Sequence, residues 1–304
     1  MEPEYPLTAI EVRPRAIGAV RAVRDHGRVT LASAASLPLP DGTISISMAQ
    51  PNVPAPEAFR DALRSVLERC GIPRSGTVAL VLPDPVARVS TIPASELAGK
   101  DASEIEDMIK FRLRKAVPFD VKEARVAYQM PATHAPEALA VAVVIARPVL
   151  ESYESVLASV GLEAGLVELA GMAILNAVES SQPVGDRLIV NWDDGYVSLL
   201  LTRRGEPVLV RTLTGEAAST ADDVARETVN TVLYYREKLG GAGLASVVMR
   251  SAVMPPTQAA ELLRSALDTA PEILDPWART GGEAAGAAGQ AVAAAAACVV
   301  GKVQ

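Results

Sequence analysis

The feature of this sequence that most constrains its fold is a repeated order of predicted elements. Two groups of three strand-like segments, marked by β-branched or alternating apolar residues, stand in the two halves of the chain. They are Leu7–Val12, Ile17–Arg24 and Arg28–Ala34, then Arg187–Asn191, Tyr196–Thr202 and Pro207–Leu213. Because a helix, a strand and a helix are predicted after each group, the chain is expected to form two related α/β lobes.

The elements after each group are predicted from periodicity and from helix-terminating residues. In the first half, a helix begins near Pro56 and Gly71 can end it, while the fully apolar TVALVL at 77–82 predicts a buried strand. Thr43–Met48 alternates apolar and polar residues, which predicts a further half-buried strand. In the second half, the corresponding helix, strand and helix are predicted over 221–239, 244–250 and 257–267, ahead of an Ala-rich helix.

An α+β segment interrupts the first half. Residues 86–165 predict a strand, a helix, two strands and a helix, which at about 80 residues is enough for a separate subdomain. The first of these helices is expected to begin with a capping box of Ser103 and Glu106 and to stop at Pro118. We therefore predict three units: residues 1–85 with 166–182 as the first lobe, 86–165 as the inserted subdomain, and 183–304 as the second lobe.

Charge and composition exclude several classes of function. The net charge of −7 and the lack of a Lys/Arg run argue against a nucleic-acid partner. The longest apolar run, Ala291–Val300, is half of the roughly 20 residues that a spanning helix needs, so no direct membrane span is expected. Cys70 and Cys298 are predicted to be buried reduced thiols. His26 and His134 fall in predicted loops without a partner at metal spacing, so no metal site is expected.

Four stretches carry a resemblance to a known family. They are LVLPDPVARVSTIP at 80–93, KAVPFD at 115–120, AVAVVIARPVLESYESVLASVGLEAGLVEL at 140–169 and NTVLYYREKLGG at 230–241. In order and spacing they resemble PilM, the actin-like component of type IV pilus assembly, and more distantly FtsA and the cytoplasmic domain of GspL. The resemblance implies an actin-like (ribonuclease H-like, ASKHA superfamily) fold with duplicated lobes and an α+β insert in the first. A segment that the family has before the late helix is missing here, so the second lobe is expected to be shortened.

The resemblance also implies where a nucleotide would bind, and this sequence departs from the family at each of those places. Active members hold phosphates with small residues at two hairpin tips and adenosine with a Gly-rich turn. Here the degenerate positions are Glu11, Arg13 and Arg15 in the first hairpin, Asn191 and Asp193 in the second, and Arg250 in the adenosine turn. We expect a cleft too crowded and too acidic for a triphosphate, no catalytic residue, no cofactor, and thus a pseudo-ATPase. The alternative is an active actin-like ATPase that binds ATP and Mg, in which Arg13 or Arg15 clamps a phosphate.

The family resemblance implies a cytoplasmic scaffold at the inner face of the inner membrane, in a type IV pilus or related secretion machine. Its expected partner is the cytoplasmic N-terminal peptide of a PilN-like membrane protein, with other assembly proteins as further candidates. The peptide is expected in a groove between the first lobe and the insert. The candidate partner-binding residues are Arg88, Arg112, Val117, Pro118 and Phe119, although Phe119 can equally be core packing. A filament-forming relative is disfavoured, because the tail AVAAAAACVVGKVQ has no basic amphipathic face.

Overall fold

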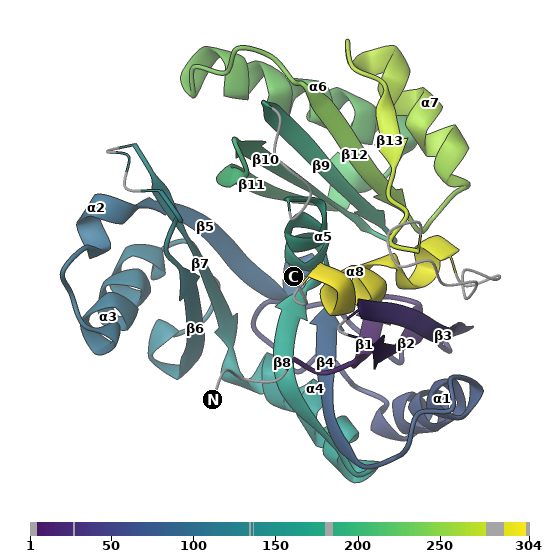
Figure 1. The fold of residues 1–304 in the computed structure, drawn as a ribbon. Helices are drawn as coiled ribbons and strands as arrows, with labels where there is room; N and C mark the ends of the chain where they lie inside the picture. Colours follow the sequence, from purple (N-terminus) through teal and green to yellow (C-terminus); the bar gives the residue numbers. More distant parts are fainter. Residues whose placement is uncertain are drawn as a thin grey trace.

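The computed structural model of the chain describes residues 5–26, 28–133, 135, 137–179, 185–277 and 289–301. Within them the chain forms two five-stranded mixed sheets and one three-stranded antiparallel sheet (Figure 1). Their strand orders are β3-β2-β1-β4-β8, β11-β10-β9-β12-β13 and β5-β7-β6. Each large sheet begins as an antiparallel meander and continues with parallel strands, which confirms the predicted duplicated lobes. None of the helices described is both long enough and apolar enough to cross a membrane.

The first lobe is built around β4, which lies between β1 and β8 and is buried over its last five residues. Helix α1 begins at a proline and ends ahead of Gly71, whose φ of 59° fits the predicted terminator. The elements of this lobe are β1 (Thr8–Arg13), β2 (Ala16–Asp25), β3 (Arg28–Pro38), α1 (Pro56–Arg69), β4 (Gly76–Leu82), α4 (Arg147–Ser159), β8 (Leu162–Leu169) and α5 (Ala170–Glu179).

The strand predicted over Thr43–Met48 is wrong. The segment is an extended loop that is held to Asn52, whose backbone oxygen accepts from the Ser45 amide and whose side chain accepts from the Ser47 amide, both at 2.9 Å. Its apolar residues alternate because Ile44 is buried in the core of the first lobe and Ile46 packs against it. An extended loop that buries every second side chain has the same sequence pattern as a strand.

The insert is a three-stranded sheet whose one face is covered by two helices. Its elements are β5 (Ala87–Pro93), α2 (Ala94–Leu97), α3 (Ala102–Leu113), β6 (Ala124–Gln129) and β7 (Leu139–Ala146). The capping box of α3 is formed by Asp101 and Glu104, two residues before the predicted pair Ser103 and Glu106. The helix ends at Leu113, one turn before the predicted stop at Pro118.

Residues 147–165 lie with the first lobe, although the sequence prediction placed them in the insert. Strand β8 pairs in parallel with β4, and α4 packs against both β8 and α1. The ring of Tyr153 on α4 meets the ring of Phe59 on α1 edge to face, with centroids 6.4 Å apart. The insert as a structural layer is therefore the chain from β5 to β7, which leaves and re-enters the first lobe beside β4 and α4.

The second lobe repeats the plan in a reduced form. Its elements are β9 (Asp186–Asp193), β10 (Tyr196–Arg203), β11 (Glu206–Thr214), α6 (Ala221–Lys238), β12 (Ser246–Ser251), α7 (Pro256–Ala266) and β13 (Pro271–Ile273), the last of which was not predicted. Only one turn of 3₁₀ helix, Gly215–Ala218, separates β11 from α6. This short connection is the predicted shortening of the second lobe.

The last helix, α8 (Ala293–Gly301), lies on the first sheet, not within the second lobe to which residues 183–304 were assigned. It packs against α5 and against β1 and β4 (Figure 1). Its alanines are fully buried, and small side chains allow it to approach α5 closely. Helices α5 and α8 share one core with Ile189, Leu200 and Val248 of the second lobe, so together they join the two lobes.

Candidate functional site

Five of the six degenerate positions converge where the two lobes meet. Strand β1 of the first lobe supplies Glu11 and Arg13, and strand β9 of the second supplies Asn191 and Asp193. Strand β12 runs parallel to β9, and its Arg250 is in register with Asn191. All five side chains are buried, and Arg250 is fully so. The fold therefore brings five of the six positions at which the sequence departs from the family's nucleotide motifs into one buried cluster.

The guanidinium of Arg13 forms a two-pronged ion pair with Asp193 across the lobes. Its Nε donates to Asp193 Oδ2 and its Nη2 to Oδ1, both at 2.8 Å, and Nη2 also donates to the backbone oxygen of Ala252 at 2.9 Å. Such planar, bidentate pairing is the strongest form of a charged hydrogen bond. The Arg13 guanidinium is thus already occupied by a carboxylate from the second lobe.

Arg250 forms the centre of the same network. Its Nη1 donates to Asn191 Oδ1 at 2.8 Å and lies 3.3 Å from Asp193 Oδ2, while its Nη2 pairs with Glu11 Oε1. Its Nε donates to the backbone oxygen of Gln290 at 2.9 Å. Glu11 uses its second oxygen to accept from the Ala295 amide in the first turn of α8, at 2.9 Å. The network thus links both lobes and the last helix.

Asp84 belongs to this network, and the sequence analysis did not single it out. Its Oδ1 accepts from the Gly171 amide at 2.7 Å, and its Oδ2 accepts from the Asn191 side chain at 2.9 Å. Asp84 lies between Pro83 and Pro85, directly after the buried strand predicted over 77–82. The sequence signal that could have identified Asp84 is its place between two prolines at the end of a buried strand. A carboxyl group that is buried there needs a hydrogen-bond or ionic partner.

The buried carboxyl groups have shifted pKa values in opposite directions. Burial alone would raise the pKa of Asp193, but Arg250 and Arg13 outweigh it, so the pKa of Asp193 is lowered. Burial raises the pKa of Glu11 despite the nearby Arg250 and Arg13. It also raises the pKa of Asp84, against the hydrogen bonds that this carboxyl accepts. Asp193 is therefore the carboxylate that the network holds most firmly in its ionised form.

The buried side chains at the lobe interface carry both signs of charge. Arg13 and Arg250 pair with two of the three buried carboxyl groups, Asp193 and Glu11, while Asp84 is held by hydrogen bonds, so the expected acidic cleft is instead a largely paired ionic network. A triphosphate would have to displace Arg13 from Asp193 to use it as a clamp, and Pro14 has no amide to offer. Within the described part of the chain, no group of three or more His, Cys, Asp or Glu side chains is arranged to hold a metal ion.

A hollow of about 680 Å³ lies at the mouth of the cleft, outside the network. Arg15, the sixth degenerate position, lines it and pairs there with Asp194 at 2.9 Å, in a largely exposed ion pair. Arg88, one of the predicted partner-binding residues, lines the same hollow from β5. Both arginines thus stand at the rim of the cleft and not in its buried centre.

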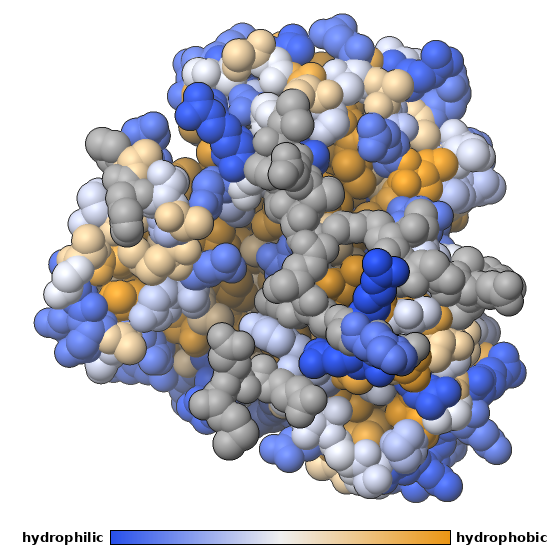
Figure 2. Space-filling view, in the orientation of Figure 1, coloured by the Kyte–Doolittle hydropathy of each residue, from blue (hydrophilic) through white to orange (hydrophobic). Residues whose placement is uncertain are grey.

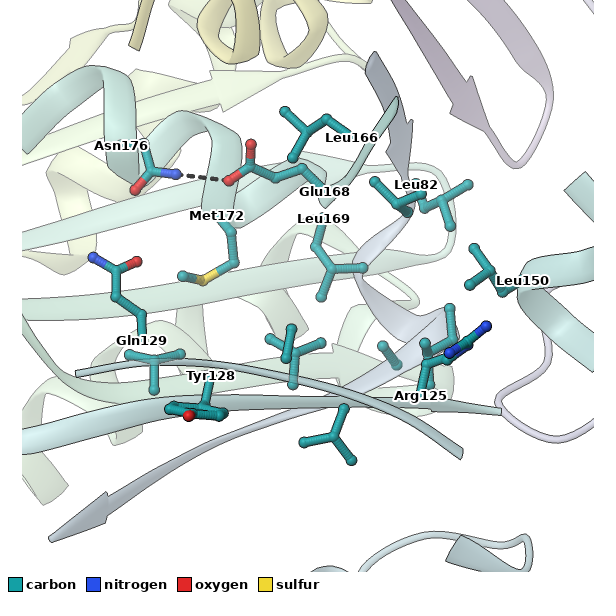
Figure 3. A pocket seen from close by; sticks show the side chains of 17 residues that line it. Leu82, Arg125, Tyr128, Gln129, Leu150, Leu166, Glu168, Leu169, Met172 and Asn176 are labelled. Atoms are coloured by element: carbon teal, nitrogen blue, oxygen red, sulfur yellow. Dashed lines mark hydrogen bonds between the residues drawn. The ribbon is translucent and has the colours of Figure 1, made fainter. Parts of the chain in front are cut away.

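A second hollow, of about 290 Å³, separates the insert from the first lobe. One wall is the insert sheet, mainly β6 and β7; the other consists of β8, the start of α5 and Leu150 of α4 (Figure 3). Its apolar lining includes Val141, Val143, Ile145, Leu166, Leu169 and Met172. In the space-filling view, orange side chains lie at the depth of this hollow (Figure 2). We call it the insert groove.

The insert groove has two properties that suit an extended chain. Strands β6 and β8 are the outermost strands of their sheets among the residues described, and both line the groove over several consecutive residues. Polar groups stand at its ends: Arg125 near Leu150 at one, Gln129 and Asn176 at the other (Figure 3). The Asn176 amide donates to Glu168 at 2.6 Å, which fixes that end of the wall.

The other predicted partner-binding residues lie elsewhere. Arg112 is exposed on α3 and pairs with Glu96, and Pro118 is exposed in the turn after α3. Val117 is half-buried, and Phe119 packs against both the core of the first lobe and that of the insert. None of these residues is among the described residues that line the insert groove. The residues that do line it were missed because its walls come from sheet edges more than 35 positions apart in sequence.

The chain is similar to known proteins in structure only. No protein-family model matches the sequence, and no curated protein matches it. A chain of a "PilM-PilN type IV pilus biogenesis complex" matches with a TM-score of 0.76 at 17% identity, over 99% of this chain and 98% of that one. A Bacteroides thetaiotaomicron protein of unknown function with an actin-like ATPase fold matches with a TM-score of 0.53 at 8% identity, over 88% of this chain and 90% of that one. These matches establish an actin-like α/β fold. The cytoplasmic domain of Vibrio cholerae EpsL, an inner-membrane component of type II secretion, is more distant, with a TM-score of 0.48 at 11% identity over 85% and 93%.

Proposed function

We propose that this chain is a non-catalytic scaffold that holds an extended segment of a partner protein in the insert groove. Its setting would be a type IV pilus or related secretion machine, at the cytoplasmic face of the inner membrane. The partner would be a PilN-like membrane protein with a short cytoplasmic N-terminal segment. The observation that carries the proposal is the groove itself, an apolar hollow between two sheet edges of a fold that is similar to PilM in a complex with PilN.

The geometry of the groove favours an extended peptide over a helix or a small ligand. An edge strand offers backbone amides and carbonyls on one side, so that an added strand gains main-chain hydrogen bonds while its alternate side chains enter pockets. The hollow of about 290 Å³ is at the lower limit of volume for small-molecule sites, which suits apolar side chains of a peptide better than a whole ligand. The apolar side chains of β7 on one wall, and those of β8 with Met172 of α5 on the other, would bind those side chains across the hollow.

The ionic network at the lobe interface supports the non-catalytic part of the proposal. Phosphoryl transfer depends on donors that are free to stabilise charge on the transferred group. Here the guanidinium groups of Arg13 and Arg250 are bound to Asp193, Glu11 and Asn191. A nucleotide would have to break buried pairs that cost several kcal/mol to separate.

The first test is binding of synthetic peptides that represent the cytoplasmic tails of membrane proteins encoded beside this chain. Binding is measured by calorimetry, and the site by hydrogen exchange of the complex. We expect one tail to bind and to protect backbone amides of β6 or β8, with α6 on the second lobe as the unaffected reference. Binding that leaves both edge strands unprotected, or no binding by any tail, contradicts the proposed site.

The second test concerns nucleotide and is independent of the first. The melting temperature is measured with and without saturating Mg-ATP. A ligand at 100 times its dissociation constant would add about 2.7 kcal/mol to the free energy of unfolding, a shift that is easily seen. We expect no shift. A clear rise in the melting temperature would favour the alternative of an active actin-like ATPase.

A further inference from the structure

Helix α3 of the insert presents a stripe of side chains in which opposite charges are separated along its length. Asp101 caps its N-terminus, Glu104 and Asp107 lie in its first half, and Arg114 and Lys115 lie in the turn after its last residue. All of these residues are exposed. The acidic end lies at the helix N-terminus and the basic end at the C-terminus, as the helix dipole favours. The stripe thus has an acidic half and a basic half.

An apolar centre lies between the two halves. Phe111 is 65% exposed, the largest exposed fraction among the large apolar side chains described. Next to it, a hollow of about 560 Å³ between α2 and α3 is lined by Ile92, Leu97 and Met108. The guanidinium of Arg114 lies 3.9 Å from the centroid of the Phe111 ring and extends this surface. α2 and α3 lie on the side of the insert that faces away from both lobes (Figure 1).

The spacing of these residues makes the stripe complementary to itself. Positions 104, 108 and 111 share one face of α3 by their steps of four and three, and the cap residue Asp101 and Lys115 in the following turn continue this spacing at either end. Met108 stands midway between Asp101 and Lys115. A second copy laid antiparallel about Met108 would set each acidic end against a basic end, with both Phe111 rings near the centre. A two-fold contact of this kind uses the same patch on both chains.

We propose that the α3 stripe is a surface through which this chain pairs with a second copy of itself. An anionic membrane fits less well, because the acidic half of the same stripe would be repelled by it. Each copy would place Phe111 beside the hollow of the other, and the charged ends would set the antiparallel orientation. This inference does not rest on the proposed function of the insert groove, which lies on the opposite face of the insert sheet.

The test is sedimentation velocity of the full chain over a range of concentrations. We expect a reversible dimer whose dissociation constant rises at least about tenfold in Phe111→Ala, because exposed aromatic anchors dominate such contacts. The matched control is Leu233→Ala on α6, a large apolar side chain that is 45% exposed, which should leave the dissociation constant unchanged. A chain that stays monomeric at every concentration, or a dimer that Phe111→Ala leaves intact, overturns the proposal.

A charge-reversal pair tests the orientation. Glu104→Lys with Asp107→Lys leaves Asp101 as the one acidic residue of the stripe and also removes the Glu104 half of the capping box, and Arg114→Glu with Lys115→Glu makes the stripe acidic throughout. Each double variant should be monomeric alone, and an equimolar mixture of the two should restore the dimer. These residues are exposed, so circular dichroism melts should confirm that both variants are folded. A mixture that remains monomeric overturns the proposal. A wild-type chain that forms no dimer, and that instead cosediments with phosphatidylglycerol vesicles only when Phe111 is present, also overturns it.

Discussion

Arg13 and Asp193 are 180 residues apart in the chain, and two hydrogen bonds of 2.8 Å join their side chains in the buried interface between the lobes. Each stands at the end of the first strand of its own lobe, in duplicated positions. A pair that occupies the two equivalent hairpins holds the lobes in one relative arrangement. The interface between the two lobes is therefore held by an internal ionic contact.

Removal of either partner should destabilise the protein strongly. Arg13→Ala leaves the Asp193 carboxylate buried with one cation fewer, and loss of one partner of a buried pair costs about 3 to 5 kcal/mol. A double variant, Arg13→Met with Asp193→Leu, replaces the pair by apolar side chains and should recover most of that loss. Urea unfolding of the single variants Arg13→Met and Asp193→Leu and of the double variant gives the three losses to compare. A double variant whose loss equals the sum of two single losses would contradict this account.

The pH dependence of stability should have two opposing parts. The pKa of Glu11 is raised above its ordinary 4.5, and that of Asp84 above its ordinary 3.8, so the folded state binds these protons more tightly than the unfolded chain does. The stabilisation that these two groups contribute is complete below their pKa values in the unfolded chain. It is lost as pH rises through their pKa values in the folded protein. From neutral pH downward, the free energy of unfolding should therefore increase as these groups take up protons.

Asp193 has the opposite sign. Its pKa is lowered from 3.8 in the folded protein. The stabilisation that it contributes is therefore present above its pKa in the unfolded chain and is lost as pH falls through its pKa in the folded protein. Stability should therefore decline again below about pH 3.8. Urea unfolding at a series of pH values checks both parts: Glu11→Gln should reduce the rise on mild acidification, and Asp193→Asn should weaken the decline in strong acid. A profile that Glu11→Gln leaves unchanged contradicts the assignment.

The sequence predicted those parts of the fold that local patterns determine. The two meanders were found because each strand carries its own alternation, and α1 because Gly71 ends an amphipathic run. The α3 cap was placed two residues late, since Ser103 and Glu106 satisfy the same spacing as Asp101 and Glu104. The short edge strand β13 has only three residues and no pattern of its own, so its pairing with β12 is a tertiary effect.

The candidate site was predicted only in part. The family resemblance identified Glu11, Arg13 and Asp193 as degenerate, but it could not show that Arg13 pairs with Asp193, since that contact depends on how the two lobes close. The insert groove could not be read from sequence for a related reason. Its walls are side chains of β6, β7, β8 and α5 that come together only when the insert packs beside the first lobe.

A substitution that fills the insert groove should abolish binding of the partner segment without unfolding the chain. Ala127 lines the groove on β6 and is exposed, so Ala127→Trp places an indole in the space that a bound side chain would use. We expect the affinity for the peptide to fall at least about tenfold, or about 1.4 kcal/mol. Calorimetry provides the measurement. Ala116→Trp, an exposed position outside the groove, is the matched control, and equal losses in both variants would contradict the site.

Gly18 should be required for the docking of the last helix. A Cβ at position 18 would lie 2.4 Å from Cγ1 of Val292, which is fully buried in the turn that leads into α8. Valine is stiff about its first side-chain torsion, so it cannot turn aside freely, and overpacking of this kind costs about 1 to 3 kcal/mol. Gly18→Ala should thus lower the free energy of unfolding measured in urea.

The pair Gly18 and Val292 also allows a direct check of the cause. Val292→Ala destabilises on its own because it leaves a cavity, but in the Gly18→Ala background it removes the atom that the new methyl group meets. The double variant should therefore be more stable than the sum of the two single losses predicts, since residues in contact are not additive. Losses that simply add would mean that the cost of Gly18→Ala arises elsewhere, for example from the backbone oxygen of Ala35 at 3.5 Å.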